Sequence, residues 1–368
     1  MSLDIGIIGL PRSGRTTVFN ALTRGTADVG TYTTKAKAPH IGIAKVPDAR
    51  LCRLTAMFKP KKEVPAEVRY IDIGASIKDL AANQGISGEL LNQISGVDAL
   101  LHVVRAFESE SVPYPEGSVD VSRDIVTMDM ELAFSDLAII ERRLEKIEKS
   151  LKAARPSERQ PFLHEQDLLS RLKVSLEKDI PIRELELSAE EMKLISPYQF
   201  LTAKPLLAVV NIGEAELGKQ APLELELSAS HARADCALAA LCGELEMELG
   251  QLDNEAAGEL CVEYGITERG LNRVLRLSYG LLGLISFFTV GEDETRAWSI
   301  RKGTPAVKAA GKIHSDIERG FIRAEVVGYQ DLIDCGSQPE ARRKGLLRLE
   351  GKTYIVQDGD IINFLFNV

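Results

Sequence analysis

Hydrophobic residues in the first half of the chain fall into short runs that are typical of buried strands. The run from Leu3 to Ile8 ends in glycine, and apolar residues at helical spacing follow it from Arg15 to Leu22. Further strand-like runs are Glu67 to Ile73, Ala99 to Val104 and Leu206 to Val210. The last two are continuously apolar, as expected for strands that are buried on both faces. Strands separated by helical stretches predict a mostly parallel α/β sheet.

Between about Asp124 and Lys204 the apolar residues change to the three- and four-residue steps of amphipathic helices. They recur in this way from Ile125 to Leu151, and again from Leu168 to Leu176 after a break at Arg155-Pro156-Ser157. The pattern predicts a helical coiled-coil hairpin. Because a strand-like run resumes at Leu206, the hairpin is an insertion within the α/β domain.

From about Leu284 onward, short apolar runs are broken by glycine. The end of the chain, LLRLEGKTYIVQDGDIINFLFNV, contains two strand-like runs with turns at Glu350-Gly351 and Asp358-Gly359. This predicts a separate α+β module. The predicted division is therefore an α/β domain of residues 1–123 and 205–283, a helical insertion of residues 124–204 and a C-terminal module of residues 284–368.

Composition narrows the setting in which the protein works. A chain of 368 residues that is 45% hydrophobic has ample material for a core. Its five cysteines are scattered and form no CxxC pair, which argues against a disulfide framework or a zinc site. No segment is long and apolar enough for a membrane span, and no basic leader precedes the first strand, so we expect a cytoplasmic protein without a membrane partner. A net charge of -9 argues against broad electrostatic attachment to nucleic acid and against sequence-specific DNA binding.

The stretch GLPRSGRTT, from Gly9 to Thr17, joins the first predicted strand to the first predicted helix. Its context and its two glycines match the phosphate-binding pattern GxxxxGKS/T, in which backbone amides and a helix N-terminus hold phosphate. Thr16 stands where a hydroxyl binds magnesium. Arg15, however, replaces the lysine. Its planar guanidinium group keeps the positive charge but not the geometry of an ammonium group. The loop alone leaves open whether it is a nucleotide site or a structural turn.

Several other stretches, taken together with this loop, resemble the YchF subfamily of Obg-like P-loop NTPases. They are GIIGLPRSGRTTVFNALT, KVPDARL, KPKKEVPAEVRYIDI, VDALLHVVRAFE, NIGE, SYGLLGLISFFTVGEDETRAWSIRKGTPAVKAAGKIHSDIERGFIRAEV and LRLEGKTYIVQDGDIINFLFNV. The similarity covers the whole chain in one order. It implies a P-loop domain, an inserted coiled-coil hairpin and a C-terminal TGS domain of the ubiquitin-like β-grasp type. It also implies Mg2+ with ATP, GTP being disfavoured, and association with ribosomes.

The resemblance places the nucleotide site on separate parts of the chain. The predicted binding residues are Arg12, Ser13, Gly14, Arg15, Thr16, Thr17, Asn211, Glu214, Cys242 and Gly243, with Thr16 and Asp72 as metal ligands. Related GTPases read guanine through NKxD, whose aspartate accepts from two guanine donors. In NIGE, Glu214 replaces that aspartate, and its longer side chain moves the two acceptor oxygens away from the guanine donors. Asn211 can still orient the base. The motif therefore favours ATP over GTP.

Four departures from the family surround the predicted γ-phosphate. Arg15 replaces the loop lysine, Ala36 stands at the magnesium-binding threonine, Ala75 at the glycine that senses the γ-phosphate, and Tyr114 or Pro113 at the histidine that helps to position water. Thr33 or Thr34 could replace the missing threonine by a shift of register. Phosphoryl transfer depends on positioned charge, so these losses should impair hydrolysis more than binding. We therefore expect weak nucleotide binding with slow or absent hydrolysis.

The sequence is also compatible with other interpretations. The protein could be a scaffold that binds no nucleotide, with Arg15 paired to Asp72, or a slow ATPase with rearranged catalytic residues. His102 and His314 are expected to be structural. A ribosome or structured RNA could contact the coiled coil and the TGS domain. The candidate cations are Lys59, Lys61, Lys62, Arg342, Arg343, Lys344 and Arg348.

Overall fold

The computed structural model describes residues 3–25, 40–73, 94–114, 117–230 and 236–367. The chain divides into two compact units. The first unit comprises Met1–Gly42 and Arg69–Val274, and the second comprises Ile43–Val68 and Leu275–Val368. In the described residues, no helix combines the length and the apolar character that crossing a membrane requires.

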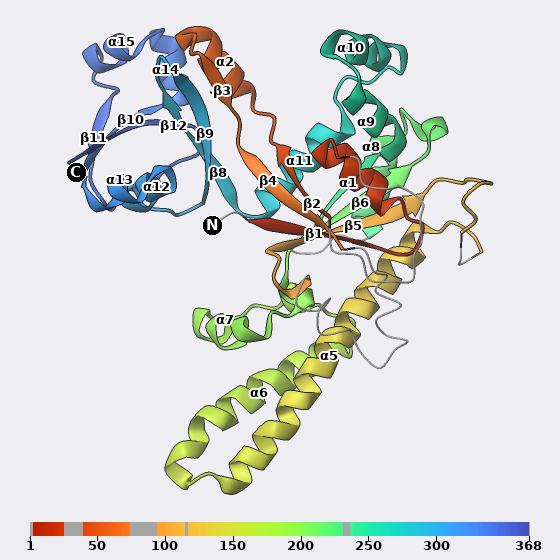
Figure 1. Ribbon diagram of the computed structural model, residues 1–368. Coiled ribbons are helices and arrows are strands. Elements are labelled where there is room, and N and C mark those ends of the chain that lie inside the picture. Colours follow the sequence, from red (N-terminus) through yellow and green to blue (C-terminus); the bar gives the residue numbers. More distant parts are fainter. Residues whose placement is uncertain (1–2, 26–39, 74–93, 115–116, 231–235, 368) are drawn as a thin grey trace. The chain divides into compact units, whose positions relative to one another are not determined.

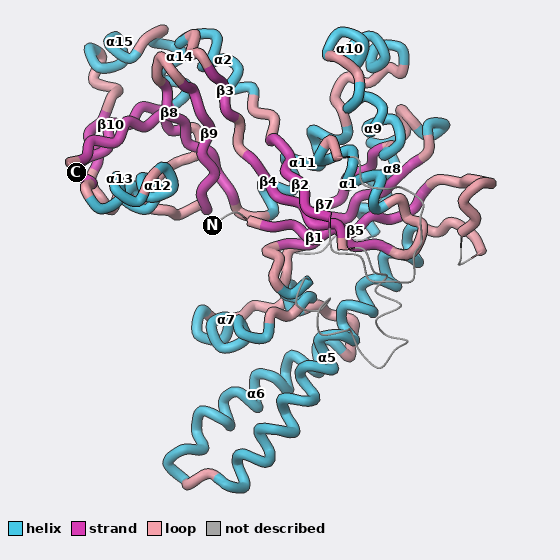
Figure 2. The backbone as a smooth tube through the Cα atoms, viewed as in Figure 1, coloured by secondary structure: helices cyan, strands magenta, loops and turns pink. Residues whose placement is uncertain are grey.

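A six-stranded sheet in the order β2-β4-β1-β5-β6-β7 forms the framework around the predicted site (Figures 1 and 2). Its strands are β1 (Asp4–Gly9), β2 (His40–Lys45), β4 (Glu67–Asp72), β5 (Ala99–Ala106), β6 (Leu206–Ile212) and β7 (Cys236–Leu241). The pairs β1–β4, β1–β5, β5–β6 and β6–β7 are all parallel. β6 is buried along its whole length and β5 along all but its last residue, which explains their continuous apolar sequences. The predicted mostly parallel α/β sheet is confirmed.

Helices lie between β1 and β2, between β5 and β6 and between β6 and β7, and three more follow β7. They are α1 (Arg15–Thr23), α7 (Ala189–Ile195), α8 (Gln220–Ser230), α9 (Gly243–Gln251), α10 (Asn254–Glu263) and α11 (Gly270–Leu281). Short 3-10 segments connect several elements: η1 (Pro156–Glu158), η2 (Ile182–Glu184), η3 (Ser196–Tyr198), η4 (Leu201–Ala203) and η5 (Glu214–Glu216). Parallel strands connected through helices bring the carboxyl ends of β1, β4, β5 and β6 to one edge of the sheet, where ligands bind in such folds.

The predicted helical hairpin is present as α5 (Val121–Ala153) and α6 (Arg159–Leu176), which extend from the sheet of the first unit (Figure 1). Ile140 and Ile147 of α5 pack with Leu168 and Leu172 of α6 in a buried apolar core. The Arg143 guanidinium also forms a two-pronged ion pair with a carboxylate of α6. These contacts pack the two helices against each other along the hairpin.

A buried carboxylate fixes the root of the hairpin. Asp136 of α5 accepts hydrogen bonds from the Leu201 amide at 2.9 Å, the Thr202 amide at 2.8 Å and the Thr202 hydroxyl at 2.6 Å. Nearby, Lys204 Nζ donates to the Val97 carbonyl oxygen at 2.6 Å. These bonds satisfy backbone groups of the chain as it returns to β6, so the direction of α5 is set where it leaves the sheet.

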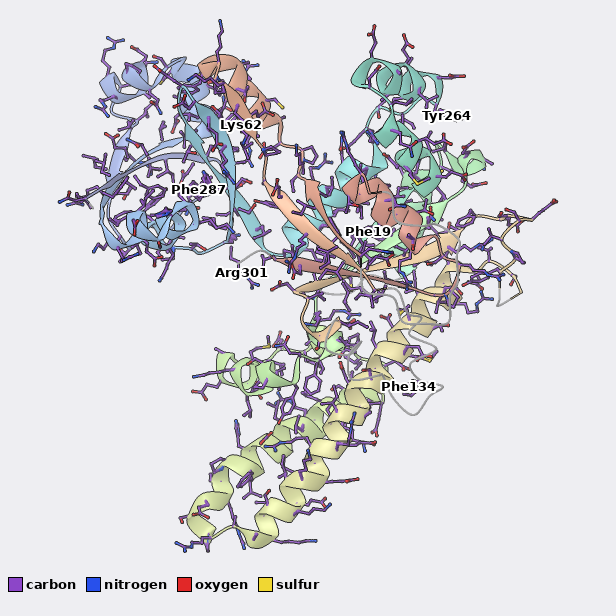
Figure 3. The ribbon with its side chains drawn as sticks, in the orientation of Figure 1. Phe19, Lys62, Phe134, Tyr264, Phe287 and Arg301 are labelled. Atoms are coloured by element: carbon purple, nitrogen blue, oxygen red, sulfur yellow. The ribbon has the colours of Figure 1, made fainter. Side chains whose placement is uncertain are left out.

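The second unit contains a mixed sheet in the order β11-β10-β12-β8-β9-β3. Its elements are α2 (Ala49–Phe58), β3 (Lys62–Val64), β8 (Leu284–Val290), β9 (Glu294–Arg301), α12 (Ala306–Ile313), α13 (Ser315–Arg319), β10 (Phe321–Gly328), α14 (Tyr329–Cys335), α15 (Gln338–Arg343), β11 (Arg348–Glu350) and β12 (Asp360–Phe366). β12 runs parallel to β8 and antiparallel to β10. Phe287, labelled in Figure 3, packs in a core with Phe364 and with Ala306 and Ala310 of α12. This is the predicted α+β module.

The second unit also includes a segment that the sequence placed in the α/β domain. The predicted domain was residues 1–123 and 205–283, whereas residues 43–68 and 275–283 group with the C-terminal module and the first unit includes the insertion. β3 pairs in parallel with β9, and the Arg50 guanidinium donates to Asp358 at 2.8 Å. Asp358 in turn accepts from the Ser286 amide at 2.9 Å. β3 and β9, and likewise Arg50 and Asp358, lie more than two hundred residues apart in the sequence, so local patterns cannot indicate these contacts.

Candidate nucleotide-binding site

The loop between β1 and α1 is tightly bent at two glycines. A Cβ on Gly9 would lie 2.6 Å from the Ser13 hydroxyl and 2.8 Å from the Val103 carbonyl oxygen. Gly14 precedes α1 with φ 84°, a left-handed conformation that strains other residues. The Val18 amide donates to the Gly14 carbonyl oxygen at 3.0 Å, so the helix begins directly after the loop. The loop therefore ends at a helix N-terminus, which favours anions.

Asp72, the last residue of β4, joins two side chains of this loop. Thr16 Oγ1 donates to Asp72 Oδ2 at 3.0 Å, and Arg15 Nε lies 2.8 Å from Asp72 Oδ1. His40 Nδ1 lies 3.9 Å from the same carboxylate. The Asp72 side chain is 2% exposed, so its interactions are screened less than those of a surface carboxylate. The structure thus brings together the two predicted metal ligands and places Arg15 on one of them.

Asn211, near the end of β6, connects the loop with the β7–α9 segment. Its Nδ2 donates to the Ser13 carbonyl oxygen at 3.1 Å, and its Oδ1 accepts from the Gly243 amide at 3.0 Å. A Cβ on Gly243 would lie 3.5 Å from the Thr17 methyl group, and a Cβ on Gly14 would collide with the Asn211 amide nitrogen. One buried amide therefore holds together segments that lie far apart in the sequence.

The remaining predicted base-side residues lie at the adjacent ends of β6 and β7. Glu214 opens the 3-10 segment η5 and is exposed, whereas Cys242 is buried directly before α9. Burial raises the pKa of the Cys242 thiol, and the Glu214 charge raises it further. The same charge is the main cause that raises the pKa of Tyr264, labelled in Figure 3. The Glu214 carboxylate thus gives this edge an exposed hydrogen-bond acceptor.

Arg105 of β5 completes the loop, although the sequence analysis did not assign it to the site. Its side chain is the largest that is fully buried among the described residues. The guanidinium donates to the carbonyl oxygens of Phe107 at 2.9 Å, Arg12 at 3.2 Å and Val112 at 2.8 Å, and it lies 4.3 Å from the centroid of the Phe107 ring. One feature of the sequence could have indicated Arg105: it is the only arginine in a continuously apolar strand, and a buried charge requires hydrogen-bond partners.

The Arg12 side chain ties the loop to the segment that follows β5. Arg12 has φ 63°, and its Nη1 donates to the Pro113 carbonyl oxygen at 2.6 Å. The next residue, Tyr114, donates its hydroxyl to the buried Asp124 near the start of α5. Arg123 also donates to Asp124, at 2.9 Å. Burial and the Asp124 carboxylate raise the Tyr114 pKa, so its hydroxyl stays protonated as the donor to Asp124.

Two of the predicted departures cannot be placed. Ala36 and Ala75 lie outside the described residues, as do Thr33 and Thr34. Within the described ranges, no group of three or more His, Cys, Asp and Glu side chains is arranged to hold a metal ion. Thr16 and Asp72 nevertheless offer the oxygen donors that Mg2+ prefers, and in phosphate sites this ion uses few protein ligands.

The two histidines have structural surroundings, as expected. His102 is buried in β5, where desolvation lowers its pKa to about 3 and keeps the ring neutral. His314 precedes α13, and its Nδ1 accepts from the Asp316 amide at 3.2 Å.

Most of the cations considered for RNA lie next to acids in the second unit. Lys61 Nζ lies 2.7 Å from Asp293. The other pairs are Arg342–Glu325, Arg343–Glu340, Lys344–Glu340 and Arg348–Glu350, at 2.6, 2.6, 4.0 and 3.9 Å. Paired cations offer less charge to phosphate than unpaired ones.

Comparisons with known proteins find similarity to YchF-type proteins along the whole chain. Residues 4–152 match a family described as 50S ribosome-binding GTPase, and residues 284–367 match the YchF-GTPase C-terminal family, described as a protein of unknown function. "Ribosome-binding ATPase YchF" of Bacillus subtilis (strain 168) is 40% identical over 370 residues, with 100% of both chains covered. "Obg-like ATPase 1" of Caenorhabditis elegans is 36% identical over 370 residues, covering 100% of this chain and 92% of that protein. Among solved structures, the Schizosaccharomyces pombe YchF GTPase matches with a TM-score of 0.85 and 32% identity, covering 99% and 98% of the two chains.

Proposed function

Because the chain belongs to the YchF subfamily of Obg-like P-loop ATPases and GTPases, we propose that it binds ATP in preference to GTP and acts as a cytoplasmic, ribosome-associated regulatory factor. The two hydrogen bonds of the Asn211 side chain are the main observation that supports nucleotide binding. A side chain that bonds both to the phosphate-side loop and to the β7–α9 segment sets the distance between a phosphate site and a base site. A structural turn would need no such link.

Glu214 supports the preference for ATP. Its exposed carboxylate directly after β6 is one methylene longer than the aspartate of NKxD, so it does not offer two acceptors at the guanine edge in the same position. Adenine has no donor at N1 or C2, and its amino group on C6 stands where guanine has O6, so adenine does not require the paired acceptor that guanine requires. A site built for two guanine donors loses much of its selectivity when the acceptor is displaced.

Thr16 and Asp72 are the residues that would hold Mg2+. The Thr16 hydroxyl and the Asp72 carboxylate lie within 3.0 Å of each other at the start of α1. The ion would neutralise phosphate charge during phosphoryl transfer. Arg15 lies on the same carboxylate, so it lowers the negative charge that Asp72 presents to a cation. We therefore also propose that hydrolysis is weak or impaired, which this competition supports.

Isothermal titration calorimetry with ATP, GTP and ADP, with and without Mg2+, tests the proposal when combined with a steady-state assay of phosphate release. ATP binding that persists without Mg2+, with little turnover, is expected. The absence of binding would favour a scaffold without a nucleotide cycle, and rapid turnover would favour an ATPase with rearranged catalytic residues. Asn211→Leu keeps the side-chain size and removes both hydrogen bonds, so it should weaken ATP binding. Asn363→Leu, on the exposed face of β12, is the matched control.

The ribosome part of the proposal depends on relatives that are named ribosome-binding ATPases. Co-sedimentation of the full-length protein with purified ribosomes tests it directly. A protein that stays in the supernatant at low salt, whether or not ATP is present, would contradict it.

A further inference from the structure

The carboxylate of Asp72 is occupied on both oxygens by side chains from the first turn of α1. Arg15 Nε lies 2.8 Å from Asp72 Oδ1, and Thr16 Oγ1 donates to Asp72 Oδ2 at 3.0 Å. The Asp72 side chain is 2% exposed and the Arg15 side chain 17%, so solvent screens this ion pair only weakly. A divalent cation that approaches Oδ1 therefore meets a guanidinium that already neutralises the carboxylate.

The start of α1 has a positive potential that favours an anion. The helix has no acidic residue in its first turn, and its N-cap residue, Gly14, has no side chain that could cap the backbone amides. The positive end of the helix dipole therefore adds to the charge of Arg15. Among the described residues, Asp72 supplies the carboxylate that lies against this side chain, so it acts as an internal counter-ion.

Arg15 stands at the position of the loop motif that contacts phosphates. In GxxxxGKS/T, the basic residue after the second glycine reaches the β- and γ-phosphates. An arginine there presents a planar fork that binds two phosphate oxygens at once, whereas Asp72 is contacted through Nε. A diphosphate or triphosphate thus offers Arg15 a more complete partner than the carboxylate does.

The exchange of partners needs no rearrangement of the loop backbone. Asn211 Nδ2 donates to the Ser13 carbonyl oxygen at 3.1 Å, and the Val18 amide donates to the Gly14 carbonyl oxygen at 3.0 Å. These bonds hold the two residues that precede Arg15. The long Arg15 side chain can therefore change its partner by rotation about its own bonds.

We propose that Arg15 determines the order in which nucleotide and metal bind. In the nucleotide-free protein, Arg15 holds Asp72 and keeps a divalent cation away from it. When a nucleotide with a β-phosphate binds, Arg15 moves to the phosphate, and Asp72 is released to join Thr16 as an oxygen donor for Mg2+. The inference rests on the proposed nucleotide binding and adds its regulation: the phosphate binds before the metal.

Binding of Mn2+ to the nucleotide-free, full-length protein tests the first half of the proposal. Mn2+ prefers the same oxygen ligands as Mg2+, and electron paramagnetic resonance measures the ions that stay free. Arg15→Met removes the guanidinium and should raise Mn2+ affinity by about tenfold or more, because the carboxylate regains its full charge. Arg15→Gln is a second variant, in case methionine disturbs the loop. The double variant Arg15→Met/Asp72→Asn should lose the gain.

Arg69→Met is the matched control, because Arg69 also donates to an aspartate of the same sheet, Asp4. This variant loses the same charge without touching Asp72, so its Mn2+ affinity should stay within about twofold of the wild type. Circular dichroism and melting temperature establish that each variant is folded. An equal gain in Arg69→Met and Arg15→Met would mean that overall charge causes the effect, and the proposal would be overturned. Unchanged Mn2+ affinity in both Arg15 variants would also overturn it.

Calorimetry with ADP in the presence of EDTA tests the second half by a double-mutant cycle. Asp72→Asn keeps the size of the side chain and removes the charge that holds Arg15, so metal-free ADP affinity should rise by about tenfold. In the Arg15→Met background, the same change removes only the repulsion between carboxylate and phosphate. There it should raise the affinity by less than about threefold.

The outcomes separate this proposal from the proposed function. Equal effects of Asp72→Asn in the two backgrounds would overturn the exchange of partners and leave nucleotide binding intact. If ADP binds to none of the proteins, the proposed nucleotide binding fails, and inorganic pyrophosphate titrated in the same cycle decides on the exchange. Pyrophosphate binding with the expected dependence on Arg15 and Asp72 supports the exchange, whereas the absence of pyrophosphate binding overturns it.

Discussion

Replacing Arg105 by methionine tests whether one buried cation builds the loop. Methionine has a similar length and no donors, so the carbonyl oxygens of Phe107, Arg12 and Val112 lose bonds of 2.9, 3.2 and 2.8 Å. A hydrogen bond from a charged donor contributes about 1.5 to 3 kcal/mol. Relief of the cost of burying the charge offsets part of the loss. We expect a net destabilisation of about 2 to 4 kcal/mol.

Differential scanning calorimetry measures this effect. For a unit of this size, the expected loss corresponds to a fall in melting temperature of about 5 to 12 °C. ATP affinity should fall by about tenfold, because the Arg12 carbonyl that positions the loop is no longer held. Arg105→Lys should be intermediate, since one ammonium group cannot reach three carbonyl oxygens with the geometry of a guanidinium.

Arg142→Met is the matched control, because Arg142 is exposed on α5 and its Nε donates only to the Ala138 carbonyl oxygen, at 2.9 Å. It should change stability by less than about 0.5 kcal/mol. If Arg105→Met melts within about 1 °C of the wild type, the three hydrogen bonds do not stabilise the loop and the reasoning is wrong.

Three further changes test the site and the hairpin root. Arg15→Lys restores the compact charge of the loop motif and should raise steady-state phosphate release by about tenfold or more; an unchanged rate would mean that another departure limits hydrolysis. Gly14→Ala puts a side chain at φ 84° against the Asn211 amide, so calorimetry should show ATP binding weakened by about tenfold or more, whereas Gly250→Ala, where a Cβ meets nothing within 4 Å, should bind normally. Burial raises the pKa of Asp136 from its ordinary 3.8 to about 6, so its contribution to stability is fully present below about pH 4 and is lost as the pH rises through 6. Urea unfolding from pH 4 to pH 7 should show this loss in the wild type and not in Asp136→Asn; equal pH profiles would refute the assignment.

The architecture was largely predictable because it depends on local patterns. Continuous apolar runs indicated β5 and β6, and steps of three and four residues indicated α5 and α6. The glycine loop before α1 was recognisable because its backbone geometry restricts the residues that it tolerates. In each case the signal lies within one stretch of sequence, as periodicity and turn chemistry require.

The resemblance also selected most of the predicted site residues, yet it could not supply their contacts. Thr16 and Asp72 are 56 positions apart, and Asn211 and Ser13 are 198 positions apart. Only the folded sheet brings these pairs within hydrogen-bond distance. Arg105 was missed for a different reason: its place in an apolar strand indicated a buried charge, but its partners are backbone carbonyls, which no side-chain pattern reveals.

The sequence by itself therefore determined the parallel sheet, the hairpin, the C-terminal module and the glycine loop before α1. The tertiary structure alone decided that residues 43–68 join the second unit, where Arg50 reaches Asp358 across 308 positions. It also decided that Arg15 and Thr16 share the Asp72 carboxylate and that Asn211 joins the two sides of the site. Secondary structure follows from neighbours along the chain, whereas these contacts depend on the order of strands in a sheet.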